Sequence, residues 1–494
     1  MLSEYRQRHN QYLTDLYRED YLFRSGRKDR HEAAFLAREY SDLFSLSVIG
    51  ELRSLLKETS ASRETELKSL GRLIAGAVEG HLAMRVQELS AEIEHYERTA
   101  EIEWGGRRIG IRAAGEALAS ESDPADRRAL YSRRAEVLKG EQDLQAELFE
   151  RLQQASGELG ADNYLILNRQ LRGVAPEAVT DAVIELLTAT ESAYLSALGP
   201  WLGREAGTSL DEATAADLVY LQRFTRFDHL FPGTRLIEQY RALCAGLGFN
   251  LDKQANLEIE TRRPGRPFCS PIRVPEEIKL GLSQKGGQAH YRESWRAAGR
   301  AQNFAWTSRE LHPEFRRLGD AAVPTAWGLL FENLMLDEVW LAETCGMGES
   351  RELRHALGLC RLMEARRNAA LSIYEAEFHS GRLSGRAGDR YVELMAEALR
   401  VRFDQAEHLE ALRAAFFPAN FLRAVAFELQ LREYLKTRFE RRWWSSRKAG
   451  EMLIDLWNTG QRYTADELAS MIGLGPLDYT GLAVDLVSQL NDLK

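Results

Sequence analysis

The chain of 494 residues is 44% hydrophobic and 28% charged, which is ordinary for a globular protein long enough to bury a large core. Its formal net charge of -9 gives no basic surplus of the kind that nucleic-acid-binding proteins use, and no run approaches the length of an apolar membrane span. The first residues lack a signal-peptide core and the four cysteines show no C-x-x-C spacing, so we expect a cytoplasmic protein with reduced thiols.

Helical periodicity dominates the amino-terminal part of the chain. Apolar positions recur at three- and four-residue spacing, with charged residues between them, over residues 5–24, 31–57, 63–98 and 125–157. This pattern predicts a mostly α-helical protein whose residues 1–160 form a domain of long helices. A second, compact domain is expected over residues 161–494.

The clearest exception to the helical pattern lies near residues 255–285. Leu257–Thr261 and Glu277–Leu282 are strand candidates, and residues 262–276, rich in proline and arginine, are expected to be irregular. We therefore predict a small β-excursion within the second domain.

The segment Tyr291–Phe304 follows this β-excursion and contains the sequence R-A-A-G-R at residues 296–300. In a helical H-E-x-x-H motif, two histidines four residues apart bind zinc, and the glutamate acts as general base on the metal-bound water. Here Arg296, Ala297 and Arg300 stand at the three chemical positions of such a motif. Guanidinium groups have no lone pair for a metal, and alanine is neither acid nor base.

The surrounding segments resemble the oligoendopeptidase F and thimet oligopeptidase family of zinc metallopeptidases. The resemblance covers roughly residues 100–490, in order. It rests on residues 190–194, 216–221, 226–232, 266–275, 286–287, 304–307, 314–320, 421–424, 443–444, 449–450 and 456–461. It implies a mostly α, two-halved helical oligopeptidase scaffold (zincin-like) around a deep channel.

The resemblance also implies where further site residues would lie. The third zinc ligand of the family, a glutamate about 25 residues past the second histidine, corresponds to Thr325. The two tyrosines that stabilise the oxyanion in active relatives correspond to Phe417 and Phe421. All the zinc ligands, the base and both hydroxyls are thus replaced, so zinc is expected only in active relatives and we expect no cofactor here.

Charge counting decides how Arg296 and Arg300 are interpreted. Zinc, two neutral histidines and two glutamates sum to zero, whereas two arginines leave a positive site. One solution is a salt bridge to Glu293 or Glu332. The other is an anionic ligand, such as a peptide carboxylate, held by Arg296 and Arg300 with Asn303 one turn further on.

These observations favour a catalytically inactive oligopeptidase homologue that binds or scaffolds a peptide or protein, with an active paralogue as one candidate partner. We expect neither nucleic acid nor membrane as a partner. Two alternatives stay open: a working zinc-dependent oligopeptidase with unorthodox ligands, and a purely structural subunit whose channel is closed.

Overall fold

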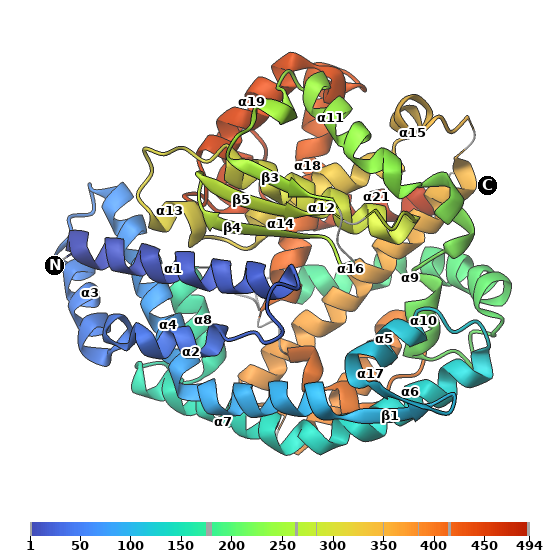
Figure 1. Cartoon of the computed structure of the whole chain (residues 1–494), viewed down its shortest axis with the longest axis horizontal. Helices are drawn as coiled ribbons and strands as arrows, with labels where there is room; N and C mark the ends of the chain where they lie inside the picture. Colours follow the sequence, from blue (N-terminus) through green and yellow to red (C-terminus); the bar gives the residue numbers. More distant parts are fainter. Residues whose placement is uncertain are drawn as a thin grey trace. The chain divides into compact units, whose positions relative to one another are not determined.

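The computed structural model describes residues 2–173, 180–261, 265–282, 284–348, 350–383, 385–412 and 416–491. Within these ranges the chain is mostly helical and contains two small sheets (Figure 1). This architecture confirms the predicted mostly α fold class. Among the described residues, no helix combines the length and the apolar character that a membrane crossing needs.

The chain forms two compact units, each assembled from segments far apart in the sequence. The first unit contains residues 1–84, 225–354 and 423–478, and the second contains residues 85–224, 355–422 and 479–494. The predicted domain of residues 1–160 contributes to both units. Helical periodicity is a local signal, and it carries no information on which distant segments pack together.

The first unit holds the larger sheet and the helices that carry residues 296–300 and 325. Its elements, including the parts of α4 and α18 that enter it, are α1 (Leu2–Arg24), α2 (Ala33–Glu39), α3 (Leu46–Glu58), α4 (Glu64–Thr99), α11 (Leu236–Gly246), β3 (Leu257–Glu260), β4 (Phe268–Arg273), β5 (Glu277–Gly281), α12 (Gln288–Ala305), α13 (Glu314–Arg317), α14 (Ala322–Glu332), α15 (Glu338–Cys345), α18 (Phe417–Phe439), α19 (Arg447–Asn458) and α20 (Ala465–Met471).

The second unit is almost entirely helical. Its elements, with most of α16, are β1 (Glu101–Trp104), β2 (Arg107–Gly110), α5 (Ile111–Leu118), α6 (Pro124–Leu138), α7 (Gln142–Glu158), α8 (Tyr164–Arg172), α9 (Thr180–Trp201), α10 (Ala215–Leu221), α16 (Arg351–His379), α17 (Ala387–Leu399) and α21 (Tyr479–Asn491). The turn of its β1–β2 hairpin is Gly105-Gly106, where both residues have positive φ, as such tight turns favour.

Two of the predicted long helices are interrupted. Residues 31–57 form α2 and α3, and the Ser45 side chain caps α3 by accepting from the Val48 amide at 3.3 Å. Residues 125–157 divide into α6 and α7 at a tight turn containing Gly140, beside which the Tyr96 ring passes too closely for any Cβ. The periodicity of short helices in series resembles that of one long helix.

The larger sheet has the strand order β3-β5-β4, with β3 parallel and β4 antiparallel to β5. Strands β3 and β5 occupy the predicted strand segments. Strand β4 was expected to be irregular, and residues 262–264 of that stretch lie outside the described residues. Proline is tolerated in β4 because this strand lies at the edge of the sheet, where Pro271 need not donate to a ladder on both sides.

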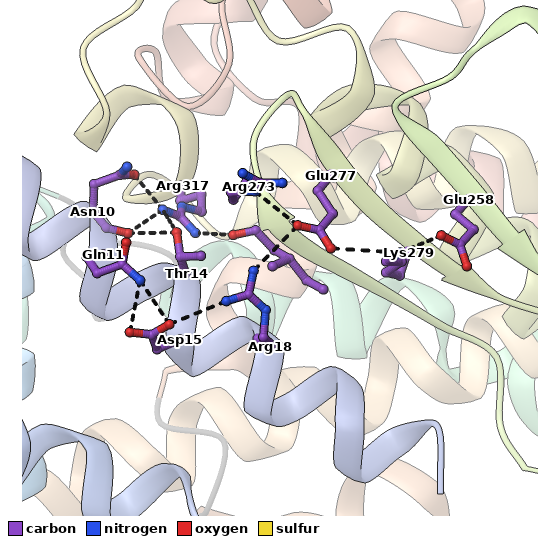
Figure 2. A network of polar contacts seen from close by, with 11 residues as sticks. Asn10, Gln11, Thr14, Asp15, Arg18, Glu258, Arg273, Glu277, Lys279 and Arg317 are labelled. Atoms are coloured by element: carbon purple, nitrogen blue, oxygen red, sulfur yellow. Dashed lines mark hydrogen bonds and ion pairs between the residues drawn. The ribbon is translucent and has the colours of Figure 1, made fainter. Parts of the chain in front are cut away.

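Helix α1 packs against β4, so an element from the start of the chain covers the sheet. Arg317 joins the two: it donates to the Ile272 carbonyl of β4 at 2.7 Å and to the Thr14 hydroxyl of α1 at 3.2 Å (Figure 2). Arg18 of α1 also lies 3.6 Å from Glu277 of β5. These contacts fix the face of α1 that points to the sheet.

Beneath α12 and α14, large aromatic side chains fill the core of the first unit. Trp295 of α12 packs edge-on against Trp340, and Trp327 of α14 packs edge-on against Trp457 of α19. All four rings are buried. Burial of such large aromatic surfaces stabilises the positions of α12 and α14 in the unit.

Candidate functional site

Helices α12 and α14 carry the four positions that the sequence resemblance aligns with a zinc site, and the two helices cross at two glycines. A Cβ at Gly299 would lie 3.0 Å from the Gly328 Cα, and one at Gly328 would lie 2.8 Å from the Arg296 carbonyl oxygen. Glu332, further along α14, meets residues earlier in α12, so the helices run antiparallel. This register places Thr325, one turn before Gly328, toward the Arg300 end of α12.

The beginning of α12 is fixed by a cap from a distant segment. Gly287, with a φ of 99°, precedes the helix, and a Cβ there would lie 2.8 Å from an Asp228 carboxylate oxygen. That carboxylate accepts from the Gln288 amide at 3.0 Å, in the first turn, where backbone donors have no partner within the helix. The cap sets the register of the residues that follow.

Arg296 forms an ion pair with Glu332 of α14. Its Nε donates to one carboxylate oxygen of Glu332, and its Nη2 donates to the other at 3.2 Å. Arg292, one turn earlier in α12, also donates to Glu332, at 2.7 Å. The Glu332 side chain is only 6% exposed, so a single buried carboxylate serves two guanidinium groups.

The second predicted partner, Glu293, lies 3.8 Å from Arg266 in an ion pair between exposed side chains. Exposed pairs of this kind contribute little to stability. Glu332 is therefore the carboxylate that matters for the charge balance of this site.

Arg300 stands apart from this pairing. It is exposed, and within the described part of the chain it has no hydrogen-bond or ion-pair partner. Its positive charge also influences the pKa of the Cys269 thiol. Burial raises the pKa of the Cys269 thiol to about 12, and Arg300 opposes that rise.

Ala297 and Thr325 complete the four positions. Ala297 is buried and offers no acid or base. The Thr325 hydroxyl donates to the Ala321 carbonyl oxygen at 2.7 Å, within the first turn of α14. Pro324 beside it also lies in that first turn, where its missing N–H costs no helical hydrogen bond.

Asn303, predicted to assist in anion binding, is fully buried. Its side-chain carbonyl accepts from Gln461 at 3.1 Å, and its backbone carbonyl accepts from the Thr307 hydroxyl at 2.9 Å. The structure thus places Asn303 in the packing beneath α12, not on the surface that carries Arg300.

The residues at the four positions do not fit zinc. Two guanidinium groups and an alanine have no lone pair to offer, and Thr325 is an alcohol engaged with the backbone. Across the described ranges, no group of three or more His, Cys, Asp or Glu side chains is arranged to hold a metal ion. The side chains at these four positions therefore support no reaction step that passes through a bound zinc ion.

Phe417 and Phe421, the positions of the expected oxyanion tyrosines, lie in the first turns of α18, in the part that belongs to the second unit. Phe421 is buried and Phe417 is 41% exposed, with ring centroids 6.0 Å apart. Neither side chain can donate a hydrogen bond. Just before them, the Phe416 amide donates to the buried carboxyl of Glu375 at 2.6 Å.

Sequence reasoning missed Arg292. This residue lies four residues before Arg296, so its place on the same helix face was readable from helical spacing. Burial raises the pKa of Tyr17, and Arg317 and Arg300 both oppose that rise.

No protein-family model matches the chain, and no curated protein does. Solved structures do match. A structure named for oligoendopeptidase F of Bacillus anthracis strain Ames has a TM-score of 0.66 and 13% identity, covering 93% of this chain and 85% of that one. PZ peptidase A, solved with an inhibitor, has a TM-score of 0.65 and 12% identity, covering 90% and 84%.

The M32 carboxypeptidase of Deinococcus radiodurans R1 matches almost end to end, with a TM-score of 0.62 and 14% identity over 100% of this chain and 98% of that one. At these identities the likeness shows a shared fold and says nothing of the site chemistry. The predicted helical peptidase fold is thereby confirmed.

Proposed function

We propose that this protein is a catalytically inactive relative of the helical oligopeptidases that binds a peptide or protein. One observation carries the proposal: α12 and α14 cross closely, and none of the four positions that the resemblance aligns with a zinc site holds a usual zinc ligand or a general base. Arg296, which corresponds to a metal ligand, is bonded to the buried Glu332. A working site would need lone-pair donors and a base at these positions.

The charge of this network makes an unorthodox zinc site an unfavourable alternative. A divalent cation near Arg292, Arg296 and Arg300 would face three guanidinium groups, two of which already bond the Glu332 carboxylate. Repulsion of this kind lowers metal affinity however the remaining ligands are supplied.

A peptide or protein ligand is supported by the three structural neighbours described above, which are named as an oligoendopeptidase, a peptidase and a carboxypeptidase. Loss of the chemistry on a retained scaffold leaves peptide binding as the property that such a fold can still provide. The partner we propose is a peptide segment, free or part of a larger protein such as an active paralogue.

Three measurements on the purified full chain test this function. Elemental analysis should find far less than one zinc per chain. A mixture of internally quenched peptides should remain uncut with or without added zinc, and fluorescein-labelled peptides should bind, with a saturable rise in anisotropy. About one zinc per chain together with chelator-sensitive cleavage would show a working peptidase, and an absence of any peptide binding would refute the binding role.

A further inference from the structure

A groove of about 400 Å³ lies between α9 and α21, two helices of the second unit. Four residues of α9 line it between Ala182 and Ala189, and seven residues of α21 line it between Tyr479 and Asn491. At a rise of about 1.5 Å per residue, the α21 wall is roughly 18 Å long. Six of these eleven residues are exposed, so the groove is open to solvent along its length.

Helix α16 fixes both walls of the groove through residues that do not line it. Arg366 of α16 donates to the Leu187 carbonyl oxygen of α9 at 2.6 Å and to the Thr190 hydroxyl at 2.7 Å. On the other wall, Arg361 of α16 forms an ion pair with Asp485 of α21. Because these contacts use other faces of α9 and α21, the groove exists before any ligand binds. Such preorganisation lowers the entropic cost of binding.

The floor of the groove is apolar. Leu186 of α9 and Ala483 of α21 are buried there, and Val487 is half-buried. Beside this floor Val484 of α21 is 66% exposed, and Ile184 of α9 is 49% exposed. Apolar side chains that stand in water beside an apolar groove give a partner surface to bury.

The charge at the edge of the groove is negative. Glu185 is the charged side chain among the lining residues, and Asp181 lies one turn before it on α9. Among the residues that the structure describes, neither carboxylate has a hydrogen-bond or ion-pair partner. The positions three and four residues after Glu185 are Thr188 and Ala189, so α9 supplies no cation there. A cation in the ligand would match this edge, and exposed charges of this kind select the sign of the partner's charge.

The shape of the groove favours a helix over a compact small molecule. A small-molecule site encloses most of its ligand, whereas this groove is open along a wall of roughly 18 Å. A third helix can lie along two neighbouring helices and insert apolar side chains at i, i+3, i+4 and i+7 between them. A wall of this length accommodates about three turns of such a helix.

We propose that the groove between α9 and α21 receives an amphipathic helix of a partner protein. The apolar face of that helix packs on Leu186, Ala483 and Val484, and a lysine or arginine at its border lies near Glu185. None of the lining residues belongs to α12 or α14, so this inference goes beyond the function proposed above and does not rest on it.

The test uses model helices of about 15 residues, long enough to span the groove, labelled with fluorescein at the amino end. The first has leucines at three- and four-residue spacing and lysines and alanines elsewhere. The second has glutamate in place of lysine, and the third is the lysine peptide scrambled so that no face is apolar. Anisotropy titrations with the full chain should show the first peptide binding saturably, at least about tenfold tighter than either of the others.

Two substitutions place the binding in the groove. Val484→Asn should weaken the lysine peptide at least about fivefold, because it removes apolar surface that the helix buries. The matched control is Val219→Asn, at a valine of α10 in the same unit that is 42% exposed and does not line the groove. It should leave the affinity unchanged.

Glu185→Lys should lower the ratio of lysine-peptide to glutamate-peptide affinity at least about fivefold. Glu116→Lys makes the same change in net charge at an exposed residue of α5, in the same unit, and should keep the wild-type ratio. Equal effects of the two variants would show that net charge alone sets the preference, which would overturn the placement of the cation near Glu185.

Three further results would overturn the inference. The first is equal binding of the lysine peptide and its scrambled form by wild type, and the second is an unchanged affinity in Val484→Asn. The third is a wild-type dimer, measured by light scattering, that Val484→Asn converts to a monomer, because a second copy of this chain would then cover the groove. Zinc content, cleavage and the binding of short peptides test the proposed function separately, so failure here leaves that function standing.

Discussion

Gly299 of α12 lies directly against Gly328 of α14, so closely that a Cβ added at Gly299 would stand 3.0 Å from the Gly328 Cα and still closer to the Trp327 carbonyl oxygen. The obstructing atoms belong to the backbone and cannot rotate away. This contact holds α12, with Arg296, Ala297 and Arg300, against α14, with Thr325.

Gly299→Ala should therefore destabilise the protein although alanine favours helices. We expect a loss of about 1–3 kcal/mol in the free energy of unfolding, the usual range for overpacking. Urea denaturation followed by circular dichroism measures it. The control is Gly50→Ala in α3, where a Cβ would meet nothing within 4 Å. That change should be neutral or stabilising by up to about 1 kcal/mol, and equal effects of the two variants would contradict the close crossing.

Glu332→Gln should lower the free energy of unfolding, because it removes the carboxylate that Arg292 and Arg296 share. The variant leaves Arg292 and Arg296 facing an amide instead of a carboxylate, so we expect about 1–3 kcal/mol of lost stability. Glu293→Gln removes a carboxylate from an exposed pair and should change stability by less than about 1 kcal/mol. If both variants unfold at the same urea concentration as wild type, the network does not stabilise α12 and α14.

Glu375→Gln should change the pH dependence of stability. Burial raises the pKa of Glu375 from 4.5 to about 8, against the opposing hydrogen bond from the Phe416 amide. Between these values the folded protein keeps a proton that the unfolded chain has lost, so the carboxyl stabilises the fold at low pH and its contribution declines as pH rises toward 8. Glutamine keeps an oxygen that can accept from Phe416 but does not titrate.

The stability of Glu375→Gln relative to wild type should thus increase from pH 6.5 to about pH 8, by up to about 1.4 kcal/mol per pH unit, and level off between pH 8 and pH 8.5. This window lies above the titration of the nearby His379, whose pKa burial lowers to about 3. Urea midpoints at five pH values across the window give the comparison. A difference that stays constant with pH would show that Glu375 is already charged in the folded protein.

The sequence anticipated the elements with strong local signals. Helix α12 was expected because residues 296–300 fill the frame of a helical motif, and β3 and β5 were expected as strand candidates. The pairing of Arg296 with Glu332 could be anticipated from charge, because a half-buried guanidinium needs a counterion. Strand β4 could not be predicted, because it contains Pro271 and lies in a proline-rich stretch that is typical of a loop, and its edge position makes Pro271 acceptable.

Other features depend on tertiary contacts that a single sequence does not encode locally. Thr14 and Arg317 are 303 positions apart, and only the packing of α1 on β4 brings them within hydrogen-bond distance. The assembly of each unit from segments far apart in the sequence likewise depends on tertiary contacts. The burial of Asn303 could not be predicted either. Asparagine at that helical position can face solvent, or it can be buried where another side chain, here Gln461, donates to it.

The measurement that tests the central claim most directly is a zinc titration of the variant Arg296→His, Ala297→Glu, Arg300→His, Thr325→Glu beside wild type. If these positions are the remains of a metal site on a retained scaffold, the variant should regain a ligand set of two histidines and a glutamate with one open position. Binding should return before activity, because Phe417 and Phe421 still lack hydroxyls for the oxyanion.

Calorimetry should therefore show one zinc per chain for the folded variant, at least about a hundredfold tighter than for wild type, with little hydrolysis of quenched peptides. A variant that folds as wild type does, by circular dichroism and urea midpoint, yet binds zinc no better would contradict the assignment of these four positions.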